Sequence, residues 1–119
     1  MIYTGKSLSV SLLEDGFAEL VFDAQGSVNK FDRQTVSELD EATQALLSKG
    51  DIKGLVVRSA KPAFIVGADI TEFTGLFAMD DAEVLQWVAN TSQVFDRFED
   101  LPFPTIAAVN GFALGGGCE

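Results

Sequence analysis

The sequence has no histidine and only one cysteine, Cys118, among its 119 residues. Without histidine, the chain lacks both the commonest general base of enzymes and a common ligand of zinc. A single cysteine cannot form an internal disulfide bond. Catalysis that depends on histidine, the usual zinc sites and internal disulfide cross-links are therefore excluded for these residues, and we expect no bound metal.

Basic residues are also scarce, because eight Lys and Arg side chains accompany 18 Asp and Glu side chains and give a formal net charge of −10. This charge repels nucleic acids and anionic membranes at long range. No apolar run approaches the roughly 18 to 20 residues that span a bilayer, and the N-terminal residues lack the basic and then apolar plan of a signal peptide. We therefore expect no nucleic-acid partner, no integral membrane segment and a cytoplasmic protein.

The apolar content is 47%, too high for an intrinsically disordered chain, and 119 residues suffice for at most one small domain. Hydrophobic periodicity and turn residues predict alternating strands and helices, and hence an α/β fold with a parallel part to its sheet. The expected elements are an antiparallel hairpin over residues 8–13 and 17–22, a helix over 33–49 capped by Asp32, a buried strand over 54–59, an amphipathic helix over 80–100 with Leu85 and Val88 on its apolar face, and a buried strand over 105–109.

Two loops carry small residues where chemistry could take place. Gly67 and Ala68 follow the strand that ends near residue 59, and Gly115, Gly116 and Gly117 follow the strand that ends near residue 109. Loops that follow parallel strands meet at the same edge of a sheet, where ligands bind in α/β proteins. A glycine loop that leads into a helix also exposes backbone N–H donors to an anion.

Several interpretations of the glycine loop can be compared. A phosphate-binding loop needs Lys and then Ser or Thr where Gly117 and Cys118 stand, and the dinucleotide fingerprint cannot be completed after Gly117. An oxyanion hole remains, with Glu119 beside it as a carboxylate acid or base. The structural alternatives are a tight turn for the glycines, a solvated helix-start Glu119, a small buried Cys118 and a helix-capping Asp69.

Two segments resemble the signature segments of the enoyl-CoA hydratase/isomerase (crotonase) superfamily: AFIVGADI at residues 63–70 and PTIAAVNGFALGGGCE at residues 104–119. Residues 1–6, 26–31 and 64–73 further resemble the alpha subunits of bacterial fatty acid oxidation complexes. The resemblance covers essentially all of residues 1–119 and corresponds to the N-terminal part of the family's hydratase domain. We therefore expect a truncated domain, with the N-terminal portion of a crotonase-like ββα superhelix.

The resemblance implies a role for particular residues. The backbone N–H groups of Ala68 and Gly116 would hold the thioester oxygen of the substrate, and Glu119 would be catalytic. Backbone at Ser27, Val28 and Val66 would line the CoA moiety, although Ser-Val-Asn at residues 27–29 departs from the commoner Ala-Leu-Asn.

The resemblance also implies an activity, the hydration of 2-trans-enoyl-CoA in fatty acid β-oxidation, with isomerase chemistry at the same site. No cofactor is needed for hydration, because CoA is part of the substrate, and NAD is implied only if a dehydrogenase region follows. The implied partners are an acyl-CoA substrate and an oligomer that includes a thiolase beta subunit. The family's second catalytic glutamate has no counterpart within these residues, so we expect the 119-residue chain alone to be inactive. The alternative is an inactive fragment or an oligomerisation module.

Overall fold

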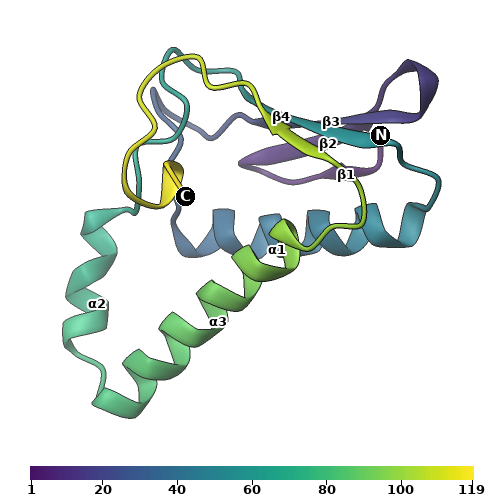
Figure 1. Cartoon of the computed structure of the whole chain (residues 1–119). Helices are drawn as coiled ribbons and strands as arrows, with labels where there is room; N and C mark the ends of the chain where they lie inside the picture. Colours follow the sequence, from purple (N-terminus) through teal and green to yellow (C-terminus); the bar gives the residue numbers. More distant parts are fainter.

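A computed structural model describes residues 1–119 and contains one five-stranded sheet, with the helices lying below it in the view of Figure 1. The strand order follows the chain, β1-β2-β3-β4-β5. Strands β1 to β3 pair antiparallel, whereas β3, β4 and β5 are parallel. The strands are β1 (Tyr3–Thr4), β2 (Leu8–Leu12), β3 (Phe17–Phe22), β4 (Gly54–Ser59) and β5 (Thr105–Ala107). The predicted α/β class and its parallel strands are thus confirmed.

The helices follow the strands in an alternating order. They are α1 (Arg33–Lys49), α2 (Phe73–Phe77) and α3 (Asp81–Glu99), with single 3₁₀ turns at Glu14–Gly16, Ile70–Glu72 and Gly115–Gly117. The predicted cap of α1 is confirmed, because the Asp32 carboxylate accepts a hydrogen bond of 2.7 Å from the Thr35 N–H. A capping carboxylate satisfies one of the N–H groups that a helix start leaves without a partner. None of these helices is both long enough and apolar enough to cross a membrane.

The hydrophobic core lies between α1 and the sheet. Leu39, Ala42 and Leu46 of α1 are almost fully buried against β2, β3 and β4, and the same cluster includes Phe64 and Ile65 from the loop after β4. These two loop residues give the segment before Gly67 a fixed place on the core. Burial of a large apolar side chain stabilises a fold by about 1.5–3 kcal/mol.

Two sequence predictions about burial are wrong. The strand expected over residues 105–109 is shorter, and all three residues of β5 are exposed. It is an edge strand that pairs only with β4, so no second neighbour covers it. In α3, Leu85 is 70% and Val88 49% exposed, and Val94 is the helix's one buried residue. Figure 1 shows why, since the first half of α3 projects away from the sheet and only its second half approaches α1.

Candidate functional site

The loop after β4 and the loop after β5 lie side by side and are joined by hydrogen bonds. The Phe64 N–H donates to the Phe112 carbonyl (2.9 Å) and the Leu114 N–H donates to the Ile65 carbonyl (3.0 Å). The Asn110 side-chain amide adds a bond of 2.7 Å to the Lys61 carbonyl. The predicted meeting of the two loops at one edge of the sheet is therefore confirmed.

Glycine is required where the two loops touch. Gly67 has a φ of +105°, and a Cβ atom there would lie 3.1 Å from the Leu114 carbonyl oxygen. Gly117 is buried, and a Cβ atom there would collide with the Ile65 carbonyl. A side chain at either position would push the loops apart, and at Gly67 the positive φ would add backbone strain.

The orientation of the Ala68 N–H is fixed through its own peptide group. The Gly67 carbonyl, which belongs to that group, accepts a hydrogen bond of 2.8 Å from the Phe31 N–H. All peptide bonds are trans, so the Ala68 N–H points away from this carbonyl. Ala68 is exposed, and its N–H donates to no other group of the protein.

Gly116 repeats this arrangement in the neighbouring loop. The Gly115 carbonyl accepts a hydrogen bond of 3.0 Å from the Cys118 N–H, which closes the 3₁₀ turn and fixes the Gly115–Gly116 peptide. The Gly116 N–H likewise donates to no protein group. A Cβ atom on Gly115 would lie 3.6 Å from the Gly67 Cα, so the two peptide groups are carried by touching segments. The two unpaired donors therefore lie on adjoining loops.

A cavity of about 770 Å³ opens beside the second loop. Gly116, Cys118 and Glu119 line one part of it. Most of its remaining wall is apolar and comes from the sheet, α3 and the loop segments, including Phe22, Phe31, Val57, Phe64, Phe95 and Ile106. Glu119, an exposed residue, therefore belongs to the lining of a mainly hydrophobic space. Cys118 is exposed and not buried as expected, because the tight turn before it leaves its side chain outside the core.

The structure places the other predicted binding residues near the first loop and outside this cavity. Ser27 is exposed and Val28 partly buried in the segment between β3 and α1. The Val66 N–H donates a 3.0 Å bond to the Asn29 carbonyl, which brings Val66 beside that segment. Ser27, Val28 and Val66 therefore come from two touching segments. Neither these three residues nor Ala68 lines the cavity that Gly116 and Glu119 share.

Asp69 acts as the expected helix cap. Its carboxylate accepts hydrogen bonds from the Thr71 hydroxyl (2.6 Å) and the Thr71 N–H (3.0 Å) at the start of the turn Ile70–Glu72. These bonds favour the charged form and hold the pKa of Asp69 below its usual range. No group of three or more His, Cys, Asp or Glu side chains is placed to hold a metal ion.

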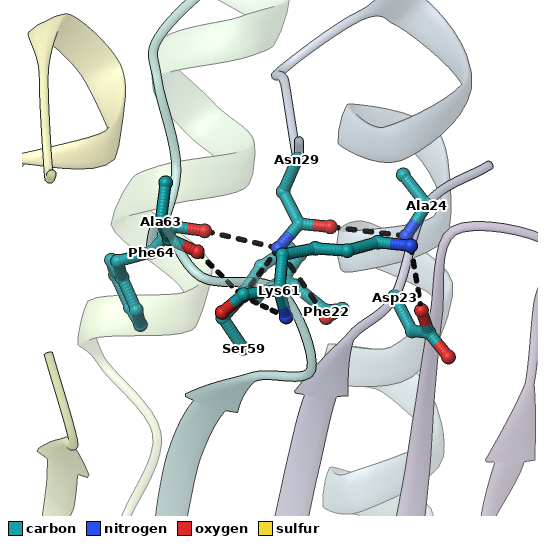
Figure 2. Close-up of polar contacts among 8 residues, drawn as sticks. All are labelled: Phe22, Asp23, Ala24, Asn29, Ser59, Lys61, Ala63 and Phe64. Carbon is teal, nitrogen blue, oxygen red and sulfur yellow. Dashed lines mark hydrogen bonds and ion pairs between the residues drawn. The ribbon is translucent and has the colours of Figure 1, made fainter. Parts of the chain in front are cut away.

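Sequence reasoning did not single out a buried polar cluster below the first loop. Figure 2 shows the Asn29 side chain at its centre, bonded to groups from both the β3–α1 segment and the loop after β4. Asn29 is 1% exposed. The sequence offered one hint of this cluster, because Asn29 is a polar residue next to Ser27 and Val28, which were expected to contact CoA. Its partner Ser59 is 30 positions away, so the sequence did not connect the two.

Comparison with known proteins identifies the family. Residues 13–119 match the family model described as enoyl-CoA hydratase/isomerase. An enoyl-CoA hydratase from Shewanella pealeana superposes with a TM-score of 0.86 at 26% identity, over 93% of this chain and 42% of that one. An enoyl-CoA hydratase/isomerase from Xanthobacter autotrophicus gives a TM-score of 0.83 at 26% identity, over 97% of this chain and 42% of that one.

A third similar structure, an enoyl-CoA hydratase from Bacillus anthracis, has a TM-score of 0.78 at 25% identity, over 93% of this chain and 42% of that one. The chain thus spans about two-fifths of the length of each of these three proteins. The expected crotonase-like α/β fold is confirmed by these superpositions. Because the family model covers nearly all of the chain, the protein belongs to the enoyl-CoA hydratase/isomerase family.

Proposed function

We propose that this chain supplies the oxyanion hole and one catalytic carboxylate of an enoyl-CoA hydratase. The observation that carries the proposal is the pair of unpaired N–H groups, Ala68 and Gly116, each fixed through the carbonyl of its own peptide group. Glu119 follows Gly116 by three residues and lines the same cavity. Two unpaired N–H donors on adjoining loops and an acid-base group are what addition of water to an α,β-unsaturated thioester requires.

In this proposal, the thioester oxygen of a 2-enoyl-CoA accepts hydrogen bonds from Ala68 and Gly116. Glu119 takes a proton from water as the water oxygen bonds to C3, and the electrons of the C2–C3 double bond shift toward the thioester oxygen. As this enolate collapses, C2 takes up the proton that Glu119 removed from water, so that H and OH are added across the double bond and Glu119 returns to its carboxylate form. The donors stabilise the enolate more than the substrate, and the loss of one such donor costs about 2.7–4 kcal/mol. Isomerisation of the substrate's double bond would use the same oxyanion hole, with Glu119 moving a proton from one carbon of the acyl chain to another.

The finer assignments are also proposals. Ser27, Val28 and Val66 would hold the CoA moiety through their backbone, which the contact between the two segments supports. A role in fatty acid β-oxidation, as part of an alpha subunit that associates with a thiolase beta subunit in the cytoplasm, is supported by the resemblance of residues 1–6, 26–31 and 64–73. NAD would enter only through a dehydrogenase region, which these residues do not form.

The test uses a chimera, because the chain matches 42% of the Shewanella pealeana hydratase. Residues 1–119 replace the matched segment, and hydration of crotonyl-CoA is followed with the parent hydratase as positive control. We expect turnover that Glu119→Gln lowers by about 10²–10⁴-fold while acyl-CoA binding is kept, since acid-base catalysis contributes factors of this size. Glu83→Gln, at an exposed position near the start of α3, is the matched control. A folded chimera without turnover, or a Glu119→Gln variant with most of its kcat, would contradict the proposal.

A second candidate is an oligomerisation module without activity of its own. It is favoured by the exposure of apolar side chains in and after β5, where Ile106 is 63% and Phe112 72% exposed. A chimera that folds and binds crotonyl-CoA but does not hydrate it, together with self-association of the 119-residue chain, would favour this candidate.

A further inference from the structure

We infer that Asn29 and Ser59 are positioning residues for the Ala68 N–H, which they hold in its orientation from beneath the loop without contacting a ligand. The structural part of this inference, the control of one peptide group, is independent of any activity. Its catalytic consequence rests on the proposed function.

The Asn29 side chain bonds to both segments that surround it (Figure 2). Its Oδ1 accepts from the Ala24 N–H (3.0 Å), within its own segment. Its Nδ2 donates to the Ser59 hydroxyl at the end of β4 (2.8 Å) and to the Phe64 carbonyl in the loop that follows (3.0 Å), and more weakly to the Phe22 carbonyl (3.3 Å). Both the oxygen and the nitrogen of this buried amide are hydrogen-bonded. A substitution that removes either the donor or the acceptor would therefore leave other buried groups without partners.

Ser59 extends this network into the loop that carries Ala68. Its hydroxyl accepts from Asn29 and from the Lys61 N–H (2.9 Å), and it donates to the Ala63 carbonyl (2.8 Å). These bonds hold residues 61–63, which follow β4, close to the last residue of that strand. At the surface, the Lys61 ammonium pairs with Asp23 at 3.1 Å, which connects the same two segments but adds little where solvent reaches it.

The network continues through the backbone to the donor itself. The Asn29 carbonyl accepts from the Val66 N–H (3.0 Å), and two residues later the Phe31 N–H donates to the Gly67 carbonyl (2.8 Å). The second bond fixes the peptide plane that contains the Ala68 N–H. Residues 29–31 can hold that plane only while their own position is held. The Asn29 amide anchors the first of them by hydrogen bonds, and the Phe31 ring packs against Phe22 and Phe95.

Many buried polar groups stabilise a protein as a whole. Asn29 and Ser59 differ because all their partners lie at the ends of β3 and β4 or in the two segments that follow these strands, so we expect a local effect on the loop. Thr43 provides a contrast. It is fully buried in α1, and its hydroxyl donates 2.7 Å to the Leu39 carbonyl of the same helix. Substitution of Thr43 removes one buried hydroxyl, as substitution of Ser59 does, but it removes no hydrogen bond to the loop that carries Ala68.

The test measures the Ala68 N–H directly, by NMR on the 119-residue chain labelled with ¹⁵N. In the natural sequence we expect an order parameter near that of rigid backbone, about 0.85, for Ala68. In Ser59→Ala and Asn29→Asp we expect this order parameter to fall below about 0.6, or the residual dipolar coupling of Ala68 to depart from the natural value. Thr43→Val should change neither quantity. If Asn29→Asp does not fold, Ser59→Ala carries the test.

The catalytic consequence is measured in the chimera by following hydration of crotonyl-CoA. We expect Ser59→Ala to lower kcat by about 10- to 100-fold, as small misplacements of catalytic groups do, with KM changed by less than about twofold. Thr43→Val should leave kcat unchanged. An unchanged Ala68 order parameter and coupling in Ser59→Ala, an equal change in Thr43→Val, or a natural kcat in Ser59→Ala would each overturn the inference. A chimera without turnover would instead refute the proposed function, and the NMR result would still decide the positioning role.

Discussion

Gly67 and Leu114 approach so closely that a Cβ atom on Gly67 would lie 3.1 Å from the Leu114 carbonyl oxygen. Gly67 also has a φ of +105°, which L residues with side chains rarely adopt. We therefore expect Gly67→Ala to lower the free energy of unfolding by about 1–3 kcal/mol, the usual cost of such backbone strain. Urea unfolding followed by circular dichroism measures this difference.

The matched control for Gly67 is Gly75. It lies in α2, and nothing comes within 4 Å of a Cβ atom placed there. Gly75→Ala should be neutral or stabilising by up to about 1 kcal/mol, because alanine favours the helix. Equal effects of the two substitutions would show that the loops adapt to a side chain at Gly67, and that their close contact is not required.

Glu38 connects α1 to the start of β2. Its buried carboxylate accepts hydrogen bonds from the Ser7 N–H (2.9 Å), the Ser7 hydroxyl (3.1 Å) and the Leu8 N–H (3.4 Å). Glu38→Ala would leave these buried donors without an acceptor, so we expect a loss of about 1–3 kcal/mol in the free energy of unfolding. Glu38→Gln keeps one carbonyl acceptor and should lose less.

Thermal or chemical unfolding of both Glu38 variants checks this order. Gln44→Ala, at an exposed position of the same helix, is the control and should stay within about 0.5 kcal/mol of the natural protein. A Glu38→Ala variant as stable as Gln44→Ala would refute the role of Glu38 in joining the helix to the strand.

Tyr3 is the sequence's one tyrosine, so its ionisation can be followed by absorbance without overlap from another. Burial raises the pKa of Tyr3 well above its ordinary value, and the hydrogen bond of its hydroxyl to Glu41 (2.9 Å) raises it further. Because the pKa of Tyr3 is higher in the folded than in the unfolded protein, its neutral hydroxyl stabilises the fold. This contribution to the free energy of unfolding is complete below about pH 10 and is lost as the pH rises toward the folded-state pKa.

Glu41→Gln should lower the pKa of Tyr3 only in part, because the contribution of burial remains. Titration in urea gives the unfolded reference, which we expect at about pH 10. A folded protein whose tyrosinate absorbance rises at that same pH would show that the hydroxyl is neither shielded from water nor bonded to Glu41.

Local signals in the sequence were enough to predict part of the fold. The α1 helix follows from Asp32 as its cap and from apolar residues at helical spacing, and both signals lie within the helix or next to it. Leu85 and Val88 show the limit of such patterns, because an apolar stripe reveals which face could be buried but not whether another element packs on it. The two-residue strand β1 is too short for any periodic signal.

The candidate site was partly predictable for a topological reason. Gly67 and Gly115 each follow a strand of the parallel part of the sheet, and this alone indicates that their loops meet. The pairing of Asn29 with Ser59 could not be foreseen, because one asparagine and one serine 30 positions apart carry no pattern that distinguishes them from surface residues. Only the fold brings them together.

Apolar side chains remain exposed in β5 and the loop after it. Ile106 is 63%, Val109 55%, Phe112 72% and Leu114 52% exposed, all within nine residues of chain. Burial of each large apolar side chain would contribute about 1.5–3 kcal/mol before the costs of association, so we expect the 119-residue chain to self-associate as its concentration rises. Sedimentation velocity over a dilution series measures the mass distribution.

The double variant Ile106→Lys with Phe112→Ser should shift this distribution toward the monomer, because it removes two of the four exposed apolar side chains and adds a charge that is costly to bury. Leu47→Lys is the matched control, since Leu47 is an apolar side chain that is 47% exposed on α1 and not on β5 or the loop after it. It should leave the association unchanged. A natural chain that stays monomeric at all concentrations, or a Leu47→Lys variant that dissociates as readily as the double variant, would show that this surface does not drive the association.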